Sequence, residues 1–60
     1  MKLKKNDVVI WKSDMRRYPT LGVIVKVWYR PHLRYEIKYD ESIWCYLAHK
    51  EDILENLGEL

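Results

Sequence analysis

The chain has little cysteine and no phenylalanine, and Cys45 is the only cysteine among its 60 residues. One cysteine excludes an internal disulfide and a cysteine-rich zinc site, two common ways to stabilise a domain of this size. The first apolar run, residues 8–11, is much shorter than a signal-peptide core or a membrane span. We therefore expect a protein of the reducing cytoplasm that does not enter a membrane.

The absence of phenylalanine means that each of the eight aromatic rings, three Trp and five Tyr, carries a polar group. A core built for burial alone would normally include Phe, because a buried Trp N–H or Tyr O–H must find a hydrogen-bond partner. We therefore expect several of these rings to be half-exposed. Half-exposed Trp and Tyr beside Arg and Lys are typical of a binding surface.

The length predicts a single domain, residues 1–60, with a small core, because a chain of this size buries only about 60% of its unfolded surface. The net charge is +2, but it is unevenly distributed along the chain. Residues 1–38 hold ten Lys or Arg against three acidic residues, and residues 39–60 hold one Lys against six acidic residues. The fold either separates these segments into a basic and an acidic face or interleaves them into a mixed, solvated surface.

Four segments have the period-two pattern of β-strands, namely residues 8–12, 21–29, 34–39 and 43–47. In the second segment, alternation places its valines on one face and Ile24, Lys26 and Trp28 on the other. The residues expected in the core are Val9, Val23, Val25, Val27, Ile37, Leu47 and Ile53. Residues 49–60 fit either a helix or a turn followed by a strand over residues 53–56.

Several short motifs are distributed over residues 5–56. They are Asn6-Asp7-x-Val9, Leu21-Gly22-x-Ile24-Val25, the segment 35–39, Trp44, and Lys50-Glu51-Asp52-Ile53-Leu54-Glu55. This order resembles the SH3-like and Tudor-like small β-barrels, and in particular short barrel proteins of tailed bacteriophages. The resemblance implies an all-β, five-stranded, partly open antiparallel barrel, and it favours the turn and strand over the helix after residue 48. It implies no single function, because this fold hosts binders of peptides, methyl-lysine and nucleic acids.

The resemblance to Tudor-like domains also implies an aromatic cage for a methylated Lys or Arg, which binds by cation–π attraction. The matching positions are Trp11, Tyr18, Tyr39 and Trp44, with Asp40 or Glu41 beside them. The alternative is that Tyr39 and Trp44 belong to the core and Trp11 covers one end of it. Strand alternation supports this alternative, because it places Tyr39 on the same face as Ile37.

A second group of residues combines basic and aromatic side chains in the first two loops. Its members are Arg16, Arg17, Tyr18, Lys26, Trp28, Tyr29, Arg30 and Arg34. If the fold brings the loops together, the rings can stack on bases and the cations can contact phosphates, with stacking worth about 1–3 kcal/mol per base. The alternative is that Trp28 packs on a neighbouring strand and the arginines only increase solubility.

Candidates for catalysis or metal binding are weak. Cys45 and His49 lie four residues apart and His32 lies elsewhere, which is one ligand short of a zinc site. A nucleophilic Cys45 would also need a pocket and an oxyanion hole, for which this short sequence gives no signal. We therefore expect no enzymatic activity, no metal and no cofactor.

The sequence thus predicts a small non-catalytic binding module that contacts nucleic acid through its aromatic and basic loops. The alternative is a protein-interaction module, such as an adaptor, a host-factor binder or a small subunit of a complex. The acidic residues after position 39 favour this alternative, because they would repel phosphate. The oligomeric state and the identity of the partner stay open.

Overall fold

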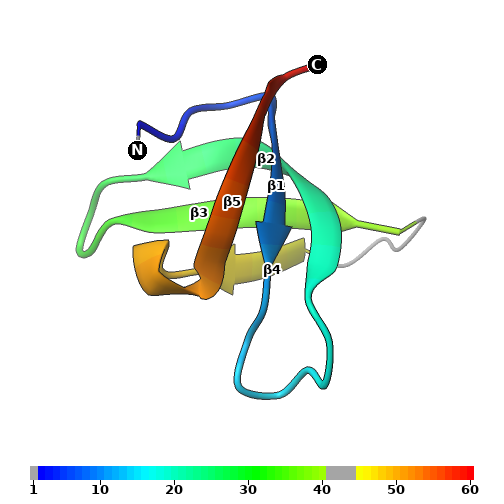
Figure 1. Ribbon diagram of the computed structural model, residues 1–60. Coiled ribbons are helices and arrows are strands. Elements are labelled where there is room, and N and C mark those ends of the chain that lie inside the picture. Colours follow the sequence, from blue (N-terminus) through cyan, green and yellow to red (C-terminus); the bar gives the residue numbers. More distant parts are fainter. Residues whose placement is uncertain (1, 41–44) are drawn as a thin grey trace.

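The computed structural model describes residues 2–40 and 45–60, which form one antiparallel sheet of five strands (Figure 1). The strands are β1 (Asp7–Trp11), β2 (Thr20–Trp28), β3 (Arg34–Tyr39), β4 (Cys45–Ala48) and β5 (Ile53–Glu59), with a short 3-10 helix, η1 (Lys50–Asp52), before β5. The strand order is β4-β3-β2-β1-β5, and the sheet is not closed into a barrel. The predicted all-β class, the five antiparallel strands and the turn and strand after residue 48 are confirmed.

The sheet folds over itself because β2 is long and curved. Figure 1 shows that β1 and β5 cross β3 and β4, while β2 runs along both layers. The core lies between these layers, and its buried apolar residues are Val9, Trp11, Ile24, Tyr35, Ile37, Ala48 and Ile53. The fold therefore leaves the opposite, outer face of each strand available to solvent or to a partner.

A bulge in β2 changes which of its residues face the core. Ile24 pairs with Ile37, whereas the next pair along the strands is Lys26 with Glu36, so Val25 has no partner on β3. An unpaired residue shifts the alternation of side chains by one position. The strand therefore does not follow the unbroken period-two pattern of its sequence.

This bulge corrects the predicted core. Ile24 is fully buried, and Val27, beyond the bulge, packs against the buried cluster. Val23 and Val25 are only half-buried and lie outside that cluster, so their assignment to the core was wrong. The sequence pattern places Val23, Val25 and Val27 on one face because nothing in it indicates the bulge.

Leu47 was also predicted to be a core residue, and this was wrong. It is 49% exposed, while its neighbour Ala48 is fully buried. Leu47 pairs with Glu36, and both side chains lie on the outer face of the sheet. The outward position of Leu47 makes it available to the site described below.

Gly22 allows Trp11 to enter the core. A Cβ atom at Gly22 would collide with the side chain of Ile37 and would lie 2.9 Å from Trp11 Nε1. The backbone of β2 therefore approaches these side chains more closely than any other residue type permits. The buried Trp11 indole occupies the space that the missing side chain leaves.

Asp7 is a buried carboxylate that joins the two ends of the chain. It accepts hydrogen bonds from the Lys4 backbone N at 3.0 Å, from Lys4 Nζ at 2.7 Å and from Asn56 Nδ2 at 3.0 Å. The hydrogen bond from the Lys4 side chain lowers the pKa of Asp7, and those from the Lys4 backbone and Asn56 act in the same direction. The segment before β1 is thereby attached to β5.

Candidate functional site

The predicted basic and aromatic residues fall into two groups at opposite ends of β2. Arg16, Arg17 and Tyr18 lie in the loop that precedes β2, whereas Tyr29 and Arg30 lie in the turn that follows it. In Figure 1 the first loop extends at the bottom of the molecule and the β2–β3 turn at the left. The fold therefore does not bring the two loops into one surface, and each end is a separate candidate.

Trp28 is the centre of the group at the end of β2. Its side chain is on the outer face of the sheet and is 40% exposed. The indole Nε1 donates a hydrogen bond to Glu36 Oε1 at 3.0 Å, and Lys26 Nζ lies 3.8 Å from the ring centroid. A cation at this distance attracts the ring face by a cation–π interaction. The ring is thus held in place by two neighbouring outer-face residues.

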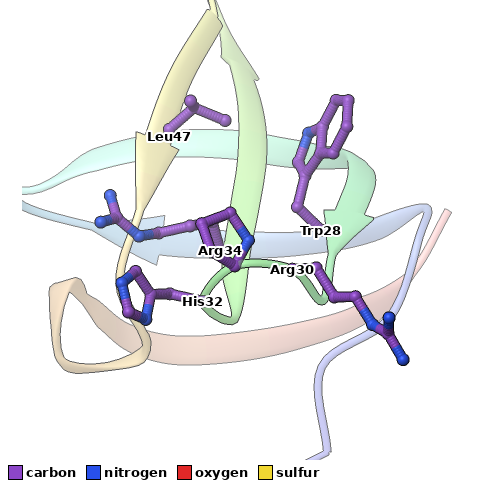
Figure 2. Close-up of a pocket in the computed structure, with 6 residues that line it drawn as sticks. Trp28, Arg30, His32, Arg34 and Leu47 are labelled. Carbon is purple, nitrogen blue, oxygen red and sulfur yellow. The ribbon is translucent and has the colours of Figure 1, made fainter.

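An open hollow of about 300 Å³ lies next to Trp28. It is lined by Trp28, Arg30, Pro31, His32, Arg34 and Leu47 (Figure 2). Lys26, whose ammonium group lies over the Trp28 ring, does not line the hollow. Figure 2 shows Arg34 and His32 on the side of β4 and Arg30 extending on the opposite side. The hollow therefore combines an apolar lining with cationic groups on two sides.

Arg34 lines the hollow and also carries a buried donor without a partner. Its Nε atom is buried and has no hydrogen-bond partner within residues 2–40 and 45–60. A buried N–H group without a partner is unfavourable by about 1–3 kcal/mol, and more when the group is charged. Because the Nε atom is buried, a ligand in the hollow can reach it only when the Arg34 side chain moves. Arg34 pairs with Trp28 across β3 and β2, but its side chain extends toward β4, away from the Trp28 ring (Figure 2).

Sequence reasoning identified Trp28, Arg30 and Arg34 but missed three residues of the hollow. Pro31 and His32 belong to the turn, and Leu47 comes from β4, which lies beside β3. Leu47 and Ala48 are neighbours on one strand, so only one of them can face the core. The sequence analysis placed Leu47 in the core, whereas the structure buries Ala48 and exposes Leu47. Tyr29 is exposed and does not line the hollow, although it was predicted as a site residue.

At the other end of β2, aromatic rings pack together inside the fold. Trp11 stacks on Tyr46, with ring centroids 4.7 Å apart, and meets Tyr39 edge-on at 5.0 Å. The guanidinium of Arg16 lies over Tyr39 at 4.7 Å and over Trp11 at 5.4 Å from the ring centroids. Arg16 Nε also donates a hydrogen bond to Thr20 Oγ1 at 2.8 Å. Arg16 is therefore engaged within the chain.

These contacts bear on the predicted aromatic cage. Trp11 and Tyr39 do meet, but Trp11 is buried within the core and does not cover one end of it. Tyr39 packs against the core, in agreement with the alternative interpretation. Tyr18 is exposed and is not part of this cluster. Trp44 and Glu41 lie outside the described residues. The position that a ligand cation would take over the Trp11 and Tyr39 rings is filled by the Arg16 guanidinium.

Tyr46 is a member of this cluster that the sequence interpretation did not single out. Its hydroxyl donates a hydrogen bond to Asp52 Oδ2 at 3.3 Å. Burial raises the pKa of Tyr46, and the negative charge of Asp52 raises it further. The tyrosine therefore stays neutral and connects β4 to η1.

Cys45 is exposed, and partial desolvation together with the charge of Glu36 raises the pKa of its thiol. A raised pKa is the opposite of what activates a nucleophilic cysteine.

Among the residues that the structure describes, no group of three or more His, Cys, Asp or Glu is placed to hold a metal ion. Within the same residues, no helix combines the length and the apolar character needed to cross a membrane.

Comparison of the chain with protein-family models, with curated proteins and with solved structures gave no match.

Proposed function

We propose that this protein is a small non-catalytic module that binds single-stranded nucleic acid at the Trp28 hollow. The observation that carries the proposal is the oriented, partly exposed Trp28 indole at a hollow that Arg30 and Arg34 also line. A base can stack on the free part of the ring, which is worth about 1–3 kcal/mol per base. Since every base has a flat π-face, such a platform accepts different sequences.

The charges around the hollow support a phosphate-bearing ligand. Lys26, Arg30 and Arg34 supply three cationic groups near Trp28. Glu36 is the acidic residue beside the ring, and its carboxylate already accepts the Trp28 N–H. The surplus of positive charge would attract phosphates and release their counterions. Arg16 has no part in this site, because its guanidinium packs on Trp11 and Tyr39.

We also propose that the fold is SH3-like or Tudor-like and that the protein is cytoplasmic. The five antiparallel strands, the long loop before β2 and the turn before β5 support the fold assignment. The single cysteine supports the location.

A protein-interaction module is the second candidate function. The lining of the hollow includes the apolar side chains of Pro31 and Leu47, and Leu47 is 49% exposed. A peptide with an apolar residue and an acidic neighbour would match the same combination of apolar surface and cations. The two candidates therefore compete for one site and differ in the ligand.

Fluorescence anisotropy of a labelled single-stranded oligonucleotide tests the proposal. We expect binding at low salt that weakens as salt is added, because phosphate contacts release counterions. An acidic peptide without nucleotides is the comparison ligand, and it should displace the oligonucleotide poorly. No oligonucleotide binding at low salt would contradict the proposal, and binding of the peptide alone would favour the second candidate.

A further inference from the structure

The outer face of β5, β1 and β2 is an apolar surface bordered by opposite charges. Its residues form two rows that cross the strands, each starting from β5. The first row contains Glu55, Ile10 and Leu21, and the second contains Gly58, Val8, Val23 and Lys38. Val9 and Trp11, the residues of β1 that alternate with Val8 and Ile10, are buried. The two rows therefore face away from the core.

Two leucines of β5 lie beside these rows. Leu54 and Leu57 fall at the two positions where the pairing of β5 with β1 shifts, so neither has a partner on β1. Both are more than half exposed, and so is Leu21 in the first row. Contiguous exposed apolar residues on a small domain are typical of an interaction site. We call this surface, formed by Val8, Ile10, Leu21, Val23, Leu54 and Leu57, the leucine face.

The charges at the two sides of the leucine face are of opposite sign. Glu55 is on the β5 side and Lys38 is on the β3 side, and both are exposed. Neither takes part in an ion pair with any other described residue. In a symmetric dimer, two leucine faces can stack on each other with the two-fold axis between them and parallel to the strands. The β5 side of one copy then lies opposite the β3 side of the other. Glu55 of each copy then approaches Lys38 of its neighbour.

We infer that the leucine face is the interface of a symmetric dimer of this chain. A two-fold interface must be complementary to itself, and an apolar strip with acid on one side and base on the other meets that condition. Two sheets that pack face to face in this way align at about 30° and bury their facing side chains. Trp28 and its hollow lie at the far end of β2 from Leu21, so the dimer leaves both hollows open.

Sedimentation velocity of the full chain over a range of concentrations tests the inference. We expect the mass to rise with concentration from that of a monomer to twice that value. Leu21→Lys should remain folded by circular dichroism, because the side chain is exposed, and should stay monomeric. Met15→Lys makes the same kind of change at an exposed residue of the first loop and should still dimerise. A wild-type protein that is monomeric at every concentration up to about 1 mM overturns the inference.

A charge exchange tests the arrangement of the two copies. Lys38→Glu and Glu55→Lys should each raise the dimer dissociation constant by roughly 2–30-fold, because symmetry breaks two surface ion pairs at once. The double variant restores opposite charges across the axis and should recover most of the wild-type affinity. A double variant that dimerises no better than the single variants overturns the proposed arrangement.

Discussion

Trp28 donates a hydrogen bond from its indole Nε1 to Glu36 Oε1 at 3.0 Å, which orients an exposed ring on the outer face of the sheet. The bulge at Val25 contributes to this geometry, because beyond it Lys26 pairs with Glu36 and Trp28 pairs with Arg34. These four side chains therefore share one face at the end of β2. A ring that is already oriented loses little conformational freedom when a ligand stacks on it.

The Trp28 ring should contribute more to oligonucleotide binding than any other exposed aromatic side chain. Trp28→Ala is expected to weaken affinity by about 5–150-fold, which corresponds to the loss of one stacked base. Trp28→Phe should retain part of the affinity, because a ring remains. Tyr18→Ala, at the opposite end of β2, is the control and should bind as the wild type does. Equal losses from Trp28→Ala and Tyr18→Ala, measured by anisotropy, would refute the assigned site.

The stability of the fold should depend on the absence of a side chain at residue 22. Gly22→Ala is expected to lower the free energy of unfolding by about 1–3 kcal/mol, because the added methyl group crowds Ile37 and Trp11. Urea denaturation followed by Trp fluorescence measures the change. An unchanged denaturation midpoint would mean that β2 and Trp11 are not packed as closely as described.

The two neighbouring residues at the β2 bulge should differ in their effect on stability. Ile24→Ala is expected to destabilise the protein by about 2–5 kcal/mol, because Ile24 is fully buried. Val25→Ala should cost less than about 1 kcal/mol, because Val25 is half-buried and unpaired. If Ile24→Ala does not fold, Ile24→Val should still cost about 0.5–1.5 kcal/mol. A larger effect at Val25 than at Ile24 would place the bulge elsewhere.

Asp7 should make the protein sensitive to acid. Its pKa is lower in the folded chain than the ordinary value of 3.8, so the charged form is favoured by folding. This stabilisation is fully present above the ordinary value and is lost as the pH falls through the lower, folded pKa. Denaturation midpoints measured from neutral to acidic pH should therefore drop less in Asp7→Asn than in the wild type. Asp14→Asn, at an exposed aspartate of the first loop, is the matched control. An identical pH dependence in wild type and Asp7→Asn would contradict this role.

The strands were predictable from the sequence because period-two alternation is a local property. The segments 21–29 and 34–39 differ from β2 and β3 by at most one residue at each end. The bulge was not predictable, because Val23, Val25 and Val27 continue the alternation through it without interruption. Before the bulge, Gly22 lies against Trp11 and Ile37 of the neighbouring strands, a tertiary contact that no local pattern encodes.

The site was predictable only in part. The cluster of Trp28, Arg30 and Arg34 is visible because these residues are close in sequence. Leu47 reaches the same hollow only because β4 pairs with β3, which is a tertiary relationship. The sequence also groups Arg16 with Tyr18, whereas the fold turns the Arg16 guanidinium onto Trp11 and Tyr39.

The salt dependence of oligonucleotide binding by two arginine variants tests the central claim most directly. Arg34→Gln and Arg17→Gln remove the same charge, one at the hollow and one in the first loop at the opposite end of β2. If a phosphate binds at Arg34, its variant should lower the slope of log affinity against log salt by about 0.7, the value for one contact with a single strand. Arg17→Gln should leave the slope at its wild-type value. Equal slopes for both variants and the wild type, or an equal decrease in both variants, would contradict a nucleic-acid site at the Trp28 hollow.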